Sequence, residues 1–167
     1  MADAESLQPN AKVSKGTALE VLVKSIFYVD DYRYVQNPKQ SFENIDSDHP
    51  LYAVVELAVE KGIIDQSGKT LDLDAPISRE ELAYWFIRSL GLEEVAKHRS
   101  IYSVPFVDKE KISDEYVGYV ALAYAFGIFQ GDQKQQFRPQ EHVSLAQLSV
   151  ANFRFAQKAV EFDIERW

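Results

Sequence analysis

The sequence predicts a helical protein built from a repeated unit, and three observations carry this prediction. Apolar residues recur at spacings of three and four along five stretches of the chain, as one buried helix face requires. Serines stand directly before three of these stretches, at positions 14, 78 and 144, where a helix N-cap is expected. These serines are 64 and 66 residues apart, so a similar capped helix recurs at a nearly constant interval.

The first part of the chain contains two of the predicted helices. One follows Ser14 and continues to about residue 27, and a proline-containing linker occupies residues 28–41. A turn-rich stretch then leads into a helix from about Pro50 to Lys61, because proline is favourable in the first turn of a helix. Gly62 favours the left-handed conformation that ends helices. Glu56 is expected on the solvent-facing side of this helix.

The central helix begins with the most informative stretch of the sequence. Ser78 and Glu81 form a predicted capping box, in which the serine hydroxyl and the glutamate side chain satisfy each other's backbone amides. The helix ends near Gly91, and residues 92–105 form a second, charged linker.

Two more helices complete the prediction. One extends from about Asp114 to Phe126, where a glycine follows it. Ser144 and Gln147 form a second predicted capping box, which opens a long final helix that continues almost to the C-terminus.

Composition bounds the function. The 167-residue chain has a formal net charge of −8 and a pI near 4.9, and no basic stripe appears, so nucleic-acid binding is not expected. Cysteine is absent, which excludes disulfides and thiolate chemistry. No apolar run is long enough to insert in a membrane. The polar, acidic start is not that of a signal peptide, so we expect either a cytosolic protein or an excised part of an exported one.

The repeat also includes the segments between the serines. Phe42 and Phe106 are 64 residues apart, and Gly62-Ile63-Ile64 matches Gly127-Ile128-Phe129 at an interval of 65. We therefore expect a single domain made of a half repeat at 7–28, two full repeats at 42–91 and 106–157, and a C-terminal tail at 158–167.

These motifs resemble the S-layer homology (SLH) family. The resemblance rests on Phe106-Val107-Asp108, Gly127-Ile128, Gly131-Asp132, Phe137-Arg138-Pro139 and Ile77-Ser78-Arg79-Glu80-Glu81-Leu82, and it covers about residues 7–157. It implies an all-α fold of helical repeats around a pseudo-threefold axis. It also implies a module that anchors exported proteins to secondary cell-wall polysaccharide, often through a pyruvylated sugar held in grooves between repeats.

Arg79 is the main candidate ligand-binding residue. A cation in the first turn of a helix opposes the helix macrodipole, so local stability does not require it. Beside free helix amides, its guanidinium could hold an anion. The alternative is a structural salt bridge to Glu80 or another nearby carboxylate. The resemblance implies the anion, because the arginine of this family motif contacts the acidic group of the ligand.

The remaining candidates surround Arg79. Ser78 and Glu80 are expected to shape its pocket, and Lys15 takes the equivalent position in the first repeat without bidentate geometry. Tyr84 and Trp85 are expected either to border the Arg79 groove or to pack in the core.

Departures from the family pattern limit these expectations. The third repeat has Leu145 where Arg79 stands, and neither full repeat has the tryptophan that usually begins the first helix of the unit. The first repeat lacks that helix, and the C-terminal tail is a candidate to take its place. At most one groove is therefore expected to bind its ligand with full strength.

The sequence shows no catalytic constellation, no metal-ligand spacing and no cofactor motif, so we do not expect an enzyme. We expect a cell-wall or cell-surface location and an anionic wall polysaccharide as the partner. The first alternative is a degenerate module that binds other protein domains or copies of itself. The second is a cytosolic helical adaptor.

Overall fold

A computed structural model describes residues 8–27 and 39–162, and within these ranges the chain is helical. Three isolated β-bridges join the segments that precede the capped helices. The α-helices are α1 (Lys15–Ile26), α2 (Tyr52–Glu60), α3 (Arg79–Ser89), α4 (Glu93–Ala96), α5 (Val117–Ala125) and α6 (Leu145–Glu161), and the 3₁₀ turns are η3 (Arg99–Ile101), η4 (Lys109–Lys111) and η5 (Asp114–Tyr116). The all-α prediction is confirmed.

The predicted serine caps are present at all three helices. Each serine hydroxyl accepts a hydrogen bond from the backbone amide three residues later, at 3.1 Å for Ser14, 3.3 Å for Ser78 and 3.2 Å for Ser144. The reciprocal bonds from Glu81 and Gln147 complete the capping boxes of α3 and α6. These bonds satisfy amides that an isolated helix start would leave unpaired.

The residues just before the three serines close a cyclic hydrogen-bond pattern. The Val13 amide donates to the Val143 carbonyl at 2.9 Å, Val143 donates to Ile77 at 2.9 Å, and Ile77 donates to Val13 at 3.1 Å. All three side chains are at most 4% exposed. This closed triangle is the physical basis of the pseudo-threefold arrangement, because each repeat supplies one donor and one acceptor.

The first residues of the capped helices repeat the same exchange. The backbone amide of the residue after each serine donates a hydrogen bond to a carbonyl of a neighbouring repeat. The next amide donates to the carbonyl that lies two residues earlier in that neighbouring repeat. These bonds are Lys15 to Ala75, Gly16 to Leu73, Arg79 to Glu141, Glu80 to Pro139, Leu145 to Ala11 and Ala146 to Pro9, at 2.8–3.0 Å. The pattern therefore fixes every capped helix against one neighbouring repeat.

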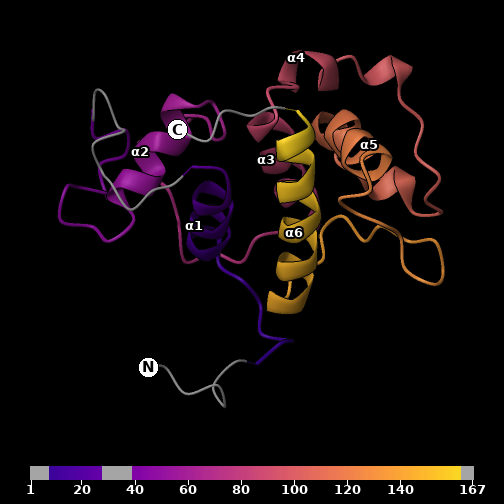
Figure 1. Ribbon diagram of the computed structural model, residues 1–167, viewed down its shortest axis with the longest axis horizontal. Helices are drawn as coiled ribbons and strands as arrows, with labels where there is room; N and C mark the ends of the chain where they lie inside the picture. Colours follow the sequence, from indigo (N-terminus) through magenta and orange to yellow (C-terminus); the bar gives the residue numbers. More distant parts are fainter. Residues whose placement is uncertain (1–7, 28–38, 163–167) are drawn as a thin grey trace.

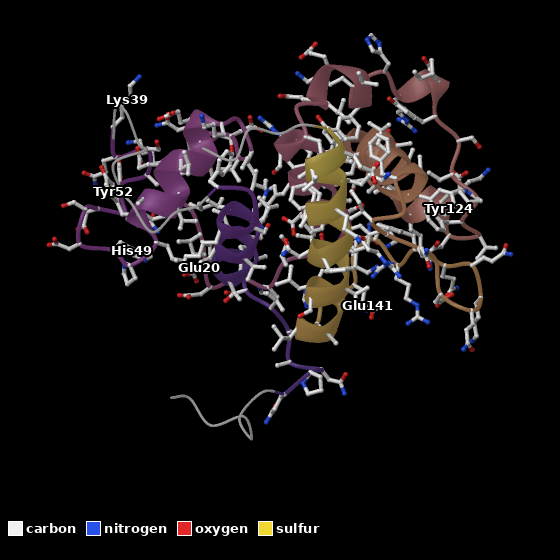
Figure 2. All side chains as sticks on the ribbon, viewed as in Figure 1. Glu20, Lys39, His49, Tyr52, Tyr124 and Glu141 are labelled. Atoms are coloured by element: carbon white, nitrogen blue, oxygen red, sulfur yellow. The ribbon has the colours of Figure 1, made fainter. Side chains whose placement is uncertain are left out.

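Helices α1, α3 and α6 form the centre of the molecule, and Figure 1 shows α2 and α5 on opposite sides of them. Helix α2 packs on α1 and α5 packs on α3, while α1 also contacts α6. Phe86 of α3 stacks on Phe155 of α6 with ring centroids 4.6 Å apart, and both side chains are fully buried. Figure 2 places Tyr52 of α2 and Tyr124 of α5 near opposite ends of the long axis.

Helix α6 differs from its two counterparts on its outer face. Val23 of α1 and Ile87 of α3 are fully buried beneath α2 and α5, whereas Phe153 at the same place of the repeat is 65% exposed. Among the described residues, no helix covers α6 in the way α2 covers α1. Part of the tail proposed for such a role, residues 163–167, lies outside the described residues.

The Phe-x-Asp/Asn motif has a structural role in both full repeats. The Asp108 carboxylate accepts hydrogen bonds from the backbone amides of Phe137 and Arg138, each at 2.8 Å. Asn44 exchanges two hydrogen bonds with the backbone of Leu71, the counterpart of Phe137. The motif therefore ties the start of each full repeat to the turn that precedes its capped helix.

Two local expectations differ from the structure. The predicted linker 92–105 contains the short helix α4 and the turn η3. Glu56 is 4% exposed instead of solvent-facing, because its carboxylate accepts hydrogen bonds from the backbone amides of Lys39 and Ser41. No helix in the described ranges is long and apolar enough to cross a bilayer.

Candidate functional site

Two cavities occupy equivalent places between neighbouring repeats. We call the first the Lys15 groove; it has a volume of about 630 Å³, and its lining includes Lys15, Asp65, Glu81, Tyr84, Trp85, Tyr116 and Tyr119. We call the second the Arg79 groove; it has a volume of about 290 Å³ and is lined by Arg79, Ile128, Phe129, Gln130, Ala146, Gln147, Val150, Ala151 and Arg154.

The two grooves correspond residue by residue through the repeat. Lys15 and Arg79 each follow the N-cap serine of one repeat, and the Gly-Ile loop of the next repeat supplies Asp65 or Gln130. The third residue of the facing capped helix is Glu81 in the first groove and Gln147 in the second. Asp65 and Glu81 of the Lys15 groove thus correspond to Gln130 and Gln147 of the Arg79 groove.

Arg79 is buried at the N-terminus of α3, with 9% of its surface exposed. Its guanidinium lies over the rings of Phe129 and Phe137, 4.9 Å from each centroid, in two cation–π contacts. Its Nε donates to the Phe137 carbonyl at 2.7 Å, and one terminal nitrogen donates to the Gln130 carbonyl at 3.2 Å. These contacts orient the guanidinium and leave further N–H groups available.

No carboxylate among the described residues lies within 4.0 Å of the Arg79 guanidinium, so the alternative of a salt bridge to Glu80 does not apply there. Burial lowers the pKa of Arg79, and the more distant charge of Glu141 partly offsets this effect. An arginine nevertheless stays protonated in proteins. The site therefore contains a fixed, buried positive charge without a contacting counter-ion.

A smaller cavity of about 270 Å³ continues from Arg79 toward the loop before α6. Asp132 and Glu141 line this second cavity, and Figure 2 labels Glu141 near the start of α6. Arg138 pairs with both carboxylates, at 2.6 Å and 3.3 Å. The acidic groups nearest to Arg79 are thus already engaged by another arginine.

Arg154 is the second cation of the Arg79 groove, and the candidate residues taken from the sequence did not include it. It projects from the middle of α6 and is partly exposed. The repeat contains a signal that could have found it, because a basic residue stands ten positions after each N-cap serine, as Lys24, Arg88 and Arg154. None of the described residues that line the Arg79 groove has a carboxylate, so within this part of the chain neither arginine meets an acidic group there.

The Lys15 groove is neutralised from within. The Lys15 ammonium contacts the Glu81 carboxylate at 2.7 Å. Arg88, at the place equivalent to Arg154, is bound by both oxygens of Asp65 at 2.6 and 2.8 Å. The Tyr84 hydroxyl donates to the same carboxylate at 2.6 Å. Glu81 and Asp65 therefore act as internal counter-ions of Lys15 and Arg88.

These ion pairs shift the pKa values of both carboxyl groups. Hydrogen bonding to Arg88 lowers the pKa of Asp65, although burial opposes this effect. Burial acts to raise the pKa of Glu81, but hydrogen bonds from Lys15 and Ser78 outweigh it, so the net shift is downward.

We expect these depressed pKa values to make the fold less stable in acid. The unfolded chain takes up protons near the ordinary carboxyl pKa of about 4, before the folded chain does. Stability from Asp65 and Glu81 is therefore fully present above that pH and falls as the pH decreases through the folded-state pKa values. Urea midpoints at pH 7, 5, 4 and 3 measure the effect, and Glu81→Gln should show a smaller loss than the wild type.

The six sequence-predicted residues lie in different environments. Arg79 lines its own groove, whereas Lys15, Tyr84 and Trp85 line the Lys15 groove. Ser78 is engaged in the capping box of α3.

Glu80 has a structural set of partners and lines neither groove. Its carboxylate accepts hydrogen bonds from the Ser113 amide and hydroxyl at 2.9 and 2.8 Å, and from the Gln140 side chain at 3.3 Å. Glu80 is 5% exposed, and it joins α3 to the segment that leads into α5.

The structure is a helical repeat module with grooves between neighbouring repeats. The family model of the S-layer homology domain matches residues 105–149. The resemblance found in the motifs is thereby confirmed for this part of the sequence. S-layer homology domains are generally non-catalytic modules that anchor proteins to the cell wall.

Two curated proteins are similar to the chain. The chain is 24% identical to an amylopullulanase of Thermoanaerobacterium thermosulfurigenes over 152 residues. This aligned region covers 91% of the chain and 8% of the amylopullulanase. The chain is 28% identical to exoglucanase XynX of Acetivibrio thermocellus over 105 residues. This aligned region covers 63% of the chain and 10% of the exoglucanase. The chain thus spans a tenth or less of the length of these relatives.

Proposed function

We propose that this module binds an acidic saccharide of a cell-wall polymer, such as a pyruvylated sugar, in the Arg79 groove. The observation that carries the proposal is the replacement of both internal counter-ions by glutamines. Where the Lys15 groove has Glu81 and Asp65, the Arg79 groove has Gln147 and Gln130. The described residues that line the Arg79 groove include two arginines and no carboxylate.

The chemistry of the groove suits a carboxylate. An arginine presents N–H donors in a planar fork that matches the two oxygens of a carboxylate. Because Arg79 is buried, water screens its charge poorly, and an anion that reaches it gains more than it would at a surface arginine. The glutamine side chains add neutral polar groups at the rim. A local site of this kind can hold an anion although the chain has a net charge of −8.

A second candidate function is a module that retains the fold without binding a saccharide. The burial of Arg79 favours it, because two carbonyl hydrogen bonds and two aromatic contacts already account for much of the side chain. In that case the partner is another protein domain or a second copy of the chain. The two candidates differ in whether an acidic sugar binds and whether Arg154 matters.

The test is isothermal titration calorimetry with a fragment of pyruvylated wall polymer. The variants are Arg79→Leu, which copies the third repeat, Arg79→Lys, which copies the first, and Arg154→Leu. Loss of one charged hydrogen-bond donor weakens binding by about 1.5 to 3 kcal/mol, or roughly 10- to 100-fold. Arg79→Lys should retain part of the affinity, since it keeps the charge and loses the fork.

Lys69→Leu is the control, because it removes one positive charge at a surface pair with Glu43 outside both grooves. It should bind like the wild type. No binding by the wild type would favour the module without a saccharide ligand. Equal losses in Lys69→Leu and Arg154→Leu would indicate general electrostatic attraction instead of a specific groove.

A location at the cell wall or cell surface follows from the same proposal. A pull-down with isolated wall material, intact or stripped of its secondary polymer, tests it without knowledge of the sugar. Binding only to the intact walls supports the anchor.

A further inference from the structure

We propose that the Lys15 groove is a second saccharide site, which takes an uncharged sugar ring and excludes anions. The inference rests on the proposed function only in assuming that the ligand is a wall polymer with both acidic and neutral sugars. The observations that support it are the charges, the aromatic wall and the free polar groups of this groove.

The cations of the Lys15 groove are paired with carboxylates of the protein, and Glu115 adds a further acidic side chain to its lining. Besides Lys15 with Glu81 and Arg88 with Asp65, the rim has the pair of Arg99 with Asp114 at 2.7 Å. An incoming carboxylate would have to displace one of these partners and would meet the remaining acidic side chains. Like charges placed side by side in a partly buried site oppose binding, so the groove selects against anions.

Aromatic rings form one wall of the groove. Tyr84 packs against Tyr116 with centroids 5.3 Å apart and against Tyr119 at 4.7 Å in an edge-to-face arrangement. Tyr84 and Tyr116 are half-buried, so parts of their surfaces remain open to the groove. A sugar ring presents apolar C–H faces, and rigid aromatic side chains bury such faces with little loss of conformational entropy.

Polar groups without protein partners accompany these rings. Within the described part of the chain, neither the Trp85 indole nitrogen nor the Tyr116 and Tyr119 hydroxyls have a hydrogen-bond partner. Burial raises the pKa of Tyr116 to about 12, so its hydroxyl remains a neutral donor and acceptor. Neutral donors beside an apolar wall match the hydroxyl groups and C–H faces of an uncharged sugar.

The Arg79 groove lacks this wall. Val150 and Ala151 stand where Tyr84 and Trp85 stand in the Lys15 groove, and no described helix takes the place that α5 occupies there. The volumes also differ, about 630 Å³ against 290 Å³. The larger groove is within the range of small-ligand sites, whereas the smaller one suits a single acidic substituent.

The experiment uses one wall-polymer fragment in two forms, native and after chemical removal of its acidic substituents. Trp167→Phe leaves Trp85 as the single tryptophan of the chain, so its fluorescence reports on the Lys15 groove. The neutral form should change this fluorescence in a saturable way. Tyr116→Ala should weaken neutral binding about three- to tenfold. Tyr124→Ala, in the adjoining helix α5 but outside the groove, should not.

Arg79→Leu separates this proposal from the preceding one. It should weaken calorimetric binding of the acidic substituent roughly 10- to 100-fold and leave the response of Trp85 to the neutral form unchanged. A wild type that binds the native form at Arg79 and gives no Trp85 response to the neutral form overturns the second site alone. Equal effects of Tyr116→Ala and Tyr124→Ala would also overturn it. If only the neutral form binds, the second site stands and the acidic site fails.

Glu81→Gln provides an independent readout of the charge argument. The substitution copies Gln147, which supports the same capping box in α6, so the helix start should be retained. It leaves Lys15 without its partner, and we expect the native, acidic fragment to gain measurable affinity for the Lys15 groove in an Arg79→Leu background. No gain in a variant with a wild-type melting temperature would contradict the assignment of Glu81 as the excluding group.

Discussion

Replacing Gln130 by Asp together with Gln147 by Glu is expected to abolish the binding of an acidic saccharide while leaving the fold intact. The double variant gives the Arg79 groove the two carboxylates that the Lys15 groove already has. Arg79 and Arg154 then gain internal counter-ions, and the ligand meets like charges in a partly buried site. Such contacts oppose binding by several kcal/mol, which corresponds to a loss of about 100-fold or more.

The fold should tolerate this change, because the preceding repeat already has Asp65 at the equivalent loop position and Glu81 at the equivalent position of the helix start. Gln8→Glu with Gln133→Glu is the matched control, since both glutamines are exposed and the net charge changes equally. Calorimetry with the same polymer fragment compares the two. If both double variants bind alike, the glutamines are not the feature that opens the groove to anions.

Gly118→Ala is expected to produce the largest loss of stability from a single small substitution. A Cβ at position 118 would lie 1.9 Å from the carbonyl oxygen of Ala96 and 2.8 Å from its carbonyl carbon. Both are backbone atoms, so α4 or α5 must move to make room. Alanine improves helix propensity by about 1 kcal/mol, but forced displacement of packed elements typically costs about 1 to 3 kcal/mol or more.

We therefore expect a net loss of about 1 to 2 kcal/mol and a melting temperature lower by about 2–8 °C. Gly68→Ala is the control, because its nearest contact would be an ordinary 3.8 Å to the Thr70 carbonyl. Thermal and urea unfolding followed by circular dichroism measure both variants. An unchanged midpoint for Gly118→Ala would mean that α4 does not pack closely on α5.

The sequence predicted the helical framework well because its signals are local. N-cap serines, capping boxes and helix-ending glycines act within one turn, and the structure has them where they were expected; Gly62 and Gly127 have φ values of 69° and 71°. The short helix α4 was missed because four residues give too little periodicity to detect. Glu56 was assigned to solvent because the loop that covers it is distant in sequence.

The candidate site was harder to predict, since a groove depends on which repeats are neighbours. Arg79 was singled out because Lys15 and Leu145 take its place in the other repeats, and it lines the smaller groove. Tyr84 and Trp85 were expected either to border the Arg79 groove or to pack in the core. They line the Lys15 groove, where Trp85 is also part of the buried core, and residues from α6 and the 127–131 loop complete the Arg79 groove.

The two grooves differ most informatively at the third residue of the facing helix, which is Glu81 in one and Gln147 in the other. Glu81 and Gln147 both serve as capping-box residues, so their difference has no consequence for the helix start. Its consequence lies across the groove, where Glu81 contacts Lys15 and Gln147 leaves Arg79 without a counter-ion. The Lys15–Glu81 contact cannot be inferred from local spacing, because the two residues are 66 positions apart.

The central claim is that an acidic sugar substituent contacts Arg79 and Arg154 together. The most direct test is an NMR titration of the guanidinium groups of arginine-labelled protein with the isolated pyruvylated sugar, which the Lys15 groove should exclude. We predict that the Arg79 and Arg154 signals, assigned through Arg79→Lys and Arg154→Lys, shift in parallel with one common dissociation constant, while Arg88 and Arg99 do not move. Saturable binding that leaves the Arg79 and Arg154 signals in place would contradict the account.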